Sequence, residues 1–200
     1  MKKRVTGFVA ILSLALIGCT KEEATITNGT NDAYTAIIEV EQTRTNLGSD
    51  GSTLWSDEDA VSIFKSSGYH QKYVVEAGGS STATLKYGGV SSQHGVNLAH
   101  NYAVYPYSAN HTINAQGVLT LDLSFLAEQT HNEGTFENNK SVMTAKSDDN
   151  NLAFFNSLSI LRVKLCSEAP GDYNINSITI TSATQPLNGL ATVDMSLDKQ

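Results

Sequence analysis

Apolar and polar side chains alternate along many short segments of this chain, and this alternation limits its fold more than any other feature. Segments 119–123 and 161–165 carry Leu or Val at every second position. A period of two places the apolar side chains on one face of an extended strand, where they can be buried while the other face stays in water. Both segments are therefore predicted to be half-buried strands.

The same alternation predicts strands along most of the chain. They are expected at Tyr34–Gln42, Val61–Phe64, Tyr73–Glu76, Thr82–Tyr87, Tyr102–Tyr107, Ser141–Lys146, Ile175–Thr181 and Leu187–Val193. Clusters of Gly, Asn, Ser and Asp separate these segments and mark turns. The best stretch of helical period, Leu123–Glu128, is short. Many short strands with frequent turns predict an all-β fold, a sandwich or a barrel.

The first residues have the pattern of a secretory signal. Three basic residues at positions 2–4 precede an apolar run from Val5 to Ile17, and a small residue, Gly18, follows it. This order of charge, apolar run and small residue is typical of a cleaved leader. The run is shorter than the roughly 20 apolar residues that cross a bilayer as a helix. Residues 1–18 are therefore predicted to be a signal peptide.

Cys19 directly follows Leu16-Ile17-Gly18, and this sequence resembles the bacterial lipobox. The resemblance implies that the cysteine receives a diacylglyceryl thioether and an N-acyl chain and becomes the mature N-terminus. A multiply acylated residue gives a stable membrane tether, whereas a single chain binds only marginally. An ordinary signal peptide followed by a chance cysteine is the alternative.

The residues after the cysteine bear on where the protein is displayed. Thr20 is followed by Lys21, Glu22 and Glu23, which resembles the short surface-export tag of Bacteroidetes-type lipoproteins. The resemblance implies an outer-membrane protein that faces the cell exterior. A solvated charged tether explains the same residues equally well, because short charged runs are usually solvated.

Net charge and cysteine content exclude several kinds of protein. The formal net charge is −7, and removal of the three leader cations lowers it to −10. Nucleic-acid binding needs clustered Lys and Arg, so this balance argues against it. Apart from Cys19, the chain has one cysteine, Cys166, so no disulfide framework is available. We expect Cys166 to be a small buried apolar residue.

Enzyme and metal signatures are weak in this sequence. Neither a Gly-x-Ser-x-Gly nor a His-Glu-x-x-His motif occurs, and the histidines lack metal-ligand spacing. These are His70, His94, His100, His111 and His131. Weak calcium binding at Asn46–Asp57 or Asp148–Asn151 is left open, although Asx turns explain both clusters more simply. We predict no enzymatic activity, no cofactor and no metal, and we expect Trp55 to anchor the core.

Several landmarks of the sequence follow one another in a defined order. The landmarks cover most of residues 34–193. They are Thr43-Arg44-Thr45, Trp55, Asp59–Phe64, Tyr102–Tyr107, Gln129, Val142–Ala145, Leu152–Phe154, Leu161–Leu165 and Ile178–Leu190 with Asn188-Gly189. Their order and spacing, which are together more specific than any single piece, resemble those of a known family, the fimbrillin-like lipoproteins of type V pili.

The resemblance implies an N-terminal domain with a transthyretin-like antiparallel β-sandwich, followed in the family by a second β domain. The expected organisation is a signal peptide (1–18), a lipidated flexible stalk (19–33), the β-sandwich domain (34–195) and the start of a truncated continuation (196–200). Family members are shaft, tip or anchor subunits of pili, joined by strand donation between subunits. The expected partners are other pilus subunits and, through the lipid, the outer membrane.

In the family, a trypsin-like protease releases the lipidated first strand from shaft subunits by cutting after an arginine. Arg44 is the only arginine between Cys19 and Arg162 and follows the first predicted strand. A cut between Arg44 and Thr45 would free that strand. An ordinary surface arginine at a strand end is the simpler interpretation, and the subunit would then keep its lipid as an anchor or adhesin.

A monomeric surface lipoprotein that binds glycans or host proteins is the second hypothesis. Tyr102, Tyr105 and Tyr107 could form a sugar-stacking patch if their rings face solvent. Alternation places Tyr105 and Tyr107 on one strand face, so at least some of these rings are expected in the core. Assembly into filaments would favour the pilus hypothesis over this one.

Overall fold

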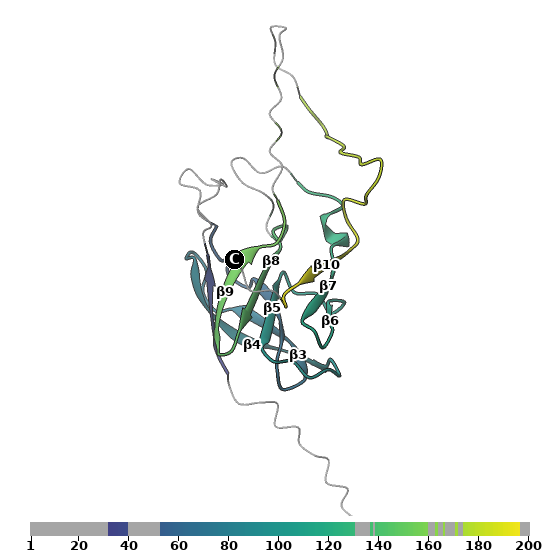
Figure 1. Ribbon diagram of the computed structural model, residues 1–200. Coiled ribbons are helices and arrows are strands. Elements are labelled where there is room, and N and C mark those ends of the chain that lie inside the picture. Colours follow the sequence, from purple (N-terminus) through teal and green to yellow (C-terminus); the bar gives the residue numbers. More distant parts are fainter. Residues whose placement is uncertain are drawn as a thin grey trace, which may run out of the picture. The chain divides into compact units, whose positions relative to one another are not determined.

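The computed structural model describes residues 32–39, 53–130, 137, 139–159, 163, 166, 171 and 174–196. The chain divides into two compact units, Met1–Thr30 and Asn31–Gln200. The described residues all belong to the second unit and are almost entirely strands and loops (Figure 1). The prediction of an all-β fold is therefore confirmed.

The strands are short and follow one another through turns. They are β1 (Tyr34–Ile38), β2 (Ala60–Phe64), β3 (Tyr69–Val75), β4 (Thr82–Gln93), β5 (Asn101–Tyr105), β6 (Thr112–Ile113), β7 (Val118–Asp122), β8 (Met143–Ser147), β9 (Asn151–Asn156) and β10 (Leu190–Asp194). A short 3-10 helix, η1 (Ser124–Leu126), follows β7 and occupies the place of the weak helical period.

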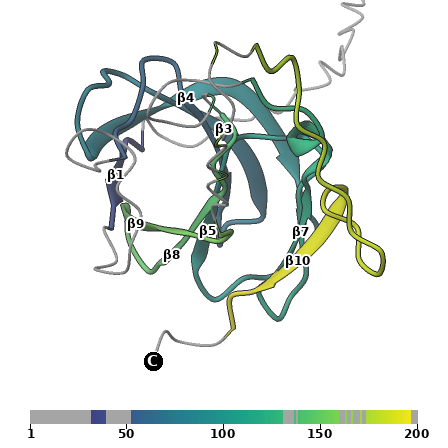
Figure 2. The same cartoon turned by 90° about the horizontal axis from the view of Figure 1, so that it is seen from above.

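Seven strands form a closed barrel in the order β1-β4-β3-β2-β5-β8-β9. Figure 2 looks into this ring, with β7 and β10 outside it. Neighbouring barrel strands are antiparallel except at the closure, where β1 runs parallel to β9. Alternation left a sandwich or a barrel open and the family resemblance implied a sandwich, but the β1–β9 pairing makes the arrangement a barrel. Alternation identifies which face of a strand is buried but not which strands pair.

The barrel interior holds the larger of two apolar cores. Every second residue of the barrel strands points inward, as the period of two requires. The members are Tyr34, Ala36, Ile38, Trp55, Val61, Ile63, Tyr73, Val75, Ala83, Leu85, Ala103, Tyr105, Met143, Ala145, Leu152 and Phe154. Trp55 is 1% exposed, so the expectation that it anchors the core is confirmed.

A second sheet, with strand order β10-β7-β6, builds the second core. Its buried leucines Leu119 and Leu121 pack in one cluster with residues from the outward faces of β2 and β5, among them Phe64 and Val104. The strands β2 and β5 are therefore buried on both faces, in agreement with the continuous run of buried positions along each. These two strands belong to both cores.

Most predicted strands are observed, with three differences in the described residues, of which the shortest is β6 (Thr112–Ile113), a strand that was not predicted. Ile175–Thr181 was predicted to be a strand and is not one: it has no strand pairing, and Ile175, Ile178 and Ile180 are more than half exposed. Alternation is not sufficient without a neighbouring strand that supplies hydrogen bonds and apolar surface. Conversely, β9 was not predicted as a strand, although its Leu152 and Phe154 alternate. Of segment 161–165, only Val163 is described, and it is exposed.

Candidate functional site

The strand β1 is hydrogen bonded along both of its edges. It pairs antiparallel with β4, with Tyr34 opposite Leu85, and parallel with β9, with Ala36 opposite Leu152. At its ends, the Thr35 amide donates to the Asn150 carbonyl at 2.8 Å, and the Ile38 amide donates to the Ser81 carbonyl at 2.8 Å. The first strand of the domain therefore closes the barrel between two strands that come much later in the sequence.

The inward face of β1 belongs to the barrel core. Tyr34, Ala36 and Ile38 are 1%, 0% and 5% exposed. The Tyr34 ring meets the Tyr73 ring edge-on, with 5.0 Å between the ring centroids. Burial raises the pKa of Tyr34 to about 12, so this phenol stays neutral and packs as part of the core.

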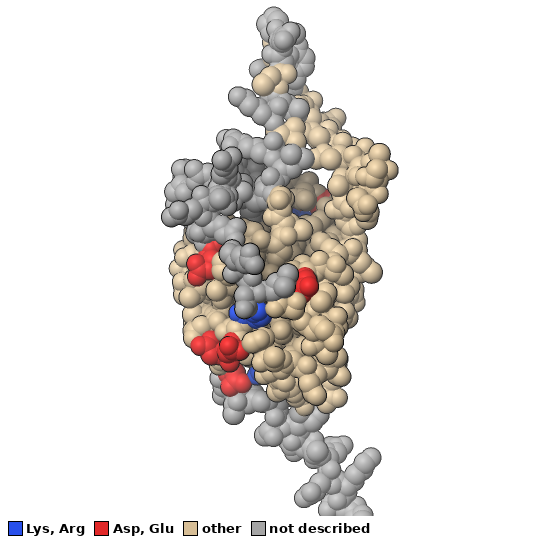
Figure 3. Space-filling model, in the orientation of Figure 1, with Lys and Arg blue, Asp and Glu red and all other residues tan. Residues whose placement is uncertain are grey.

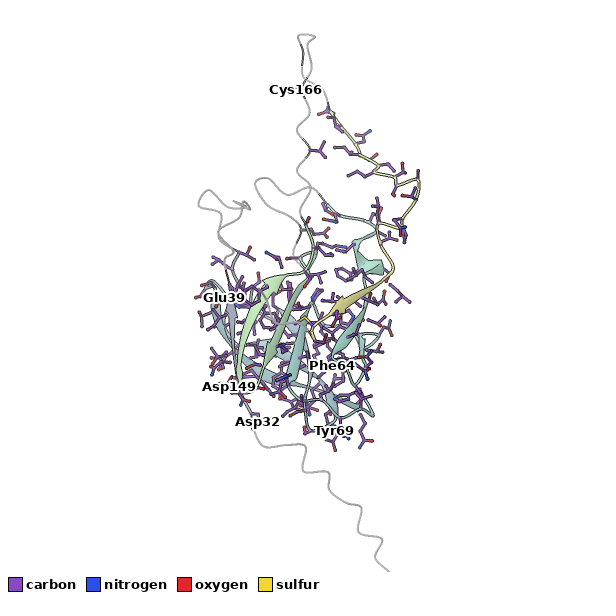
Figure 4. The ribbon with its side chains drawn as sticks, in the orientation of Figure 1. Asp32, Glu39, Phe64, Tyr69, Asp149 and Cys166 are labelled. Carbon is purple, nitrogen blue, oxygen red and sulfur yellow. The ribbon has the colours of Figure 1, made fainter. Side chains whose placement is uncertain are left out.

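A buried lysine lies at the start of β1. Lys65 follows β2 and is 9% exposed, and its Nζ lies 2.8 Å from Asp32 Oδ2. The same Nζ lies 5.8 Å from the centroid of the Tyr34 ring. Asp32 precedes Tyr34, the first residue of β1, by two positions, and its side chain is 36% exposed. Figure 4 shows Asp32 and Glu39 at opposite ends of this strand.

Removal of β1 would leave a groove that we call the β1 slot. Its two edges are the β1-facing sides of β4 and β9, whose backbone N–H and C=O groups pair with β1. Its floor is the barrel core that Tyr34, Ala36 and Ile38 now cover. Unpaired strand edges next to an apolar floor are the features that recruit another strand. An extended peptide in place of β1 would find there the same hydrogen-bond partners and the same apolar floor.

A buried carboxylate just before β2 links this strand to β5. Asp59 is 7% exposed and accepts hydrogen bonds from the Ser56 amide at 2.8 Å and the Tyr105 hydroxyl at 3.0 Å. Burial raises the pKa of this carboxyl. Trp55 packs edge-on against Tyr105 and Phe154, with centroid distances of 5.4 and 5.2 Å. This network joins β2, β5 and β9, and its charged member was not singled out from the sequence.

Three of the histidines lie near one another, although their sequence spacing did not predict it. The His70 ring stacks on Phe64 with 4.2 Å between centroids, and the His94 ring lies 6.1 Å from the same ring. His111 donates from Nε2 to the Pro106 carbonyl at 3.1 Å and accepts from the Asp122 amide at Nδ1. Within the described residues, no group of three or more side chains is arranged to hold a metal ion.

The tyrosine patch of the glycan hypothesis does not form. Tyr102 and Tyr105 are 4% and 5% exposed. Tyr107 is half-buried and borders an open pocket of about 340 Å³ with Asp122 and Phe125. Lys72 Nζ lies 5.5 Å from the centroid of the Tyr107 ring, and the His70 ring lies 5.9 Å from it. Of the three tyrosines, only Tyr107 is partly exposed, so the three exposed rings of the hypothesis are not present.

The remaining predicted site residues are distributed as follows. Cys19, Lys21, Glu22, Glu23, Arg44 and Thr45 lie outside the described residues. Cys166 is exposed, so the expectation of a buried apolar cysteine was wrong. At Asp148–Asn151, the Asp149 carboxylate accepts from the Asn151 amide at 2.7 Å and from the Ser147 hydroxyl at 2.9 Å. This cluster is thus an Asx turn, as the simpler interpretation held.

Comparisons of the chain with protein-family models, with curated proteins and with solved structures found no match. Within the described part of the chain, no helix has the length and apolar character needed to cross a membrane. Among the described residues, few charged side chains are visible on the face drawn in Figure 3. The candidate functional site of the described residues is therefore the β1 slot with the residues around it.

Proposed function

We propose that this protein is a surface lipoprotein that serves as a structural or adhesin subunit of a pilus, and that its subunits join by strand exchange in the β1 slot. The observation that carries the proposal is the position of β1. The first strand of the domain is inserted between β4 and β9 and supplies three core side chains. A strand at the end of a domain can leave without threading through the rest of the fold.

Strand exchange follows from backbone hydrogen bonding. Without β1, the slot exposes N–H and C=O groups on two strands and apolar surface from Leu85, Leu152 and Phe154, which β1 opposes. A strand from a neighbouring subunit would restore both sets of hydrogen bonds and the core contacts. Each barrel would then be completed by the next subunit, which joins the two without any further interface.

The candidate cut lies after the end of β1, so it would separate this strand from the rest of the domain. Arg44 lies six residues after Ile38, the last residue of β1. A cut between Arg44 and Thr45 would separate both β1 and the lipid at Cys19 from the rest of the domain. The segment that anchors the subunit to the outer membrane and the segment that fills the slot would thus be released together.

The alternative of a monomeric glycan-binding lipoprotein has less support. Two of its three tyrosines are in the barrel core or the second core, and Lys72 and His70 lie against the ring of the third. Binding of host proteins is compatible with a role at the tip of a pilus. We therefore retain adhesion as a property of a pilus subunit and not as a separate function.

The test is the N-terminus of the protein in surface fibres. In cells that carry the gene, fibres sheared from the surface should contain this chain starting at Thr45, in ladders of higher mass that resist mild detergent. The Arg44→Ala variant should remain in the membrane fraction with acylated Cys19 and should be absent from the ladders. Mass spectrometry and immunoblotting measure both outcomes.

A matched control is Arg162→Ala, which removes an arginine far from the predicted cut and should leave processing unchanged. The proposal is contradicted if wild-type protein occurs only as an acylated monomer, or if Arg44→Ala enters fibres as efficiently as wild type.

A further inference from the structure

The β1 slot has a charged end, and the charge belongs to the barrel and not to β1. Lys65 lies after β2, and its backbone is held in place because its amide donates to the Tyr69 carbonyl at 2.7 Å and its carbonyl accepts from the Gly68 amide at 2.9 Å. His94 Nε2 also lies 2.9 Å from the Lys65 carbonyl oxygen. The lysine therefore stays with the barrel when the first strand leaves.

Among the described residues, both groups that interact with the Lys65 ammonium group come from the segment that would leave. Asp32 Oδ2 lies 2.8 Å from Nζ, and the Tyr34 ring centroid lies 5.8 Å from it. Among the described residues, Asp32 is the one carboxylate that forms an ion pair with Lys65. In an open slot, water can solvate the ammonium group. A strand that fills the slot buries the ammonium group again and must supply an anion in place of that water.

We propose that the strand that replaces β1 carries a carboxylate at the position of Asp32, two residues before its first buried side chain, so that Lys65 selects the incoming strand. The inference rests on the proposed strand exchange and specifies the partner. That partner is a strand of another subunit with an acidic residue at the Lys65 end and apolar or small residues at the positions of Tyr34, Ala36 and Ile38. A neutral or basic residue at the first position is selected against.

The opposite end of β1 provides a matched control. Glu39 directly follows β1 and is exposed, and its amide donates to the Phe154 carbonyl at 2.9 Å. A neutral amide at position 39 changes the net charge of the strand by the same amount as a neutral amide at position 32. Only the change at position 32 removes a carboxylate next to a buried cation. A comparison of the two separates selection by Lys65 from a general effect of charge.

The experiment measures strand exchange with peptides. Residues 43–48 of the full chain are replaced by the recognition site of a sequence-specific protease, and the chain is cut with β1 still in place. A fluorescent peptide of residues 31–39 then exchanges into the slot, and unlabelled peptides compete with it in an anisotropy assay. The Asp32→Asn peptide should compete roughly tenfold less well than the wild-type peptide. The Glu39→Gln peptide should stay within about twofold of the wild-type peptide, as expected for an exposed charge.

The barrel side of the pair is tested with Lys65 variants. In Lys65→Met protein, the preference for the wild-type peptide over the Asp32→Asn peptide should disappear. Lys65→Arg protein keeps the cation, so the preference should remain. This variant also serves as the test if the methionine variant does not fold. Folding is checked by the fluorescence of the buried Trp55.

The outcomes separate the two proposals. Exchange with equal competition by the wild-type and Asp32→Asn peptides overturns the inference and leaves strand exchange intact. A preference for the wild-type peptide that persists in Lys65→Met protein also overturns it, because another group would then select the carboxylate. Failure of every peptide to exchange overturns strand exchange itself, and the inference with it.

Discussion

The pKa of His70 is set by the burial of its ring. Its ring is 7% exposed and stacks on Phe64, and its Nε2 has no hydrogen-bond partner among the described residues. Burial, with smaller contributions from nearby His111 and His94, lowers the pKa of His70 to about 4. Burial also lowers the pKa of His111. The fold therefore favours the neutral form of both rings.

The lowered pKa of His70 predicts a loss of stability in mild acid. The unfolded chain binds the proton near the ordinary pKa of 6.5, whereas the folded chain binds it only near 4. The contribution of neutral His70 is therefore complete above pH 6.5 and decreases as the pH falls toward 4. Between pH 6.5 and 4.5, the free energy of unfolding of wild type should fall by roughly 2 kcal/mol more than that of His70→Phe.

Urea unfolding at several pH values measures this difference. The phenylalanine variant keeps an aromatic ring against Phe64 and removes the titrating group, so it serves as the reference in which the other ionisable groups still titrate. Equal pH dependence of the two proteins would contradict the account of His70.

The loop between β3 and β4 is held by close backbone contacts that the sequences of these strands do not predict. The loop between β3 and β4 runs against residues 55–57: the Gly79 amide donates to the Trp55 carbonyl at 2.7 Å, and the Gly78 amide donates to Asp57 Oδ1 at 2.7 Å. A Cβ at Gly78 would lie 2.6 Å from the Asp57 amide nitrogen and 2.7 Å from the Trp55 carbonyl oxygen. Only glycine allows this approach.

Gly78→Ala should therefore destabilise the domain by about 1–3 kcal/mol, because backbone atoms on both sides must move apart. Gly95→Ala is the matched control: Gly95 has a positive φ of 72° but no atom within 4 Å of an added Cβ. Backbone strain alone should cost the control about 1 kcal/mol. Urea unfolding followed by Trp55 fluorescence measures both variants, and a Gly78→Ala protein as stable as wild type would contradict the close contact.

The two apolar cores of the described domain share two strands. β2 and β5 supply Ile63 and Ala103 to the barrel core and Phe64 and Val104 to the second core. A strand that contributes to both cores cannot lose one without weakening the other. We therefore expect the barrel and the β10-β7-β6 sheet to unfold together.

Leu121→Ala tests this coupling across the domain. Leu121 is 0% exposed in the second core, whereas Trp55, the only tryptophan, is in the barrel core. The cavity left by the substitution should lower the free energy of unfolding by about 2–5 kcal/mol. The urea transition followed by Trp55 fluorescence should show this full loss of stability and should have the same midpoint as the transition followed by far-UV circular dichroism. A Trp55 transition that stays at the wild-type midpoint while circular dichroism shows an earlier step would indicate two independent units.

The sequence by itself determined the fold class and most strand positions, because a period of two and its turn residues are local properties of the chain. It also predicted Trp55 as a core residue, since a lone tryptophan beside a strand carries much apolar surface. Alternation was wrong at Ile175–Thr181, and residue type was wrong for Cys166, because burial depends on a neighbour that the described structure does not provide.

Only the tertiary structure decided that β1 closes a barrel between β4 and β9, that Lys65 meets Asp32, and that His70 and His94 lie against Phe64. These contacts join residues far apart in the sequence, and alternation carries no information about which strands become neighbours. The physical reason is that burial can be read from the pattern of one strand, whereas pairing depends on how all strands share hydrogen bonds and core space.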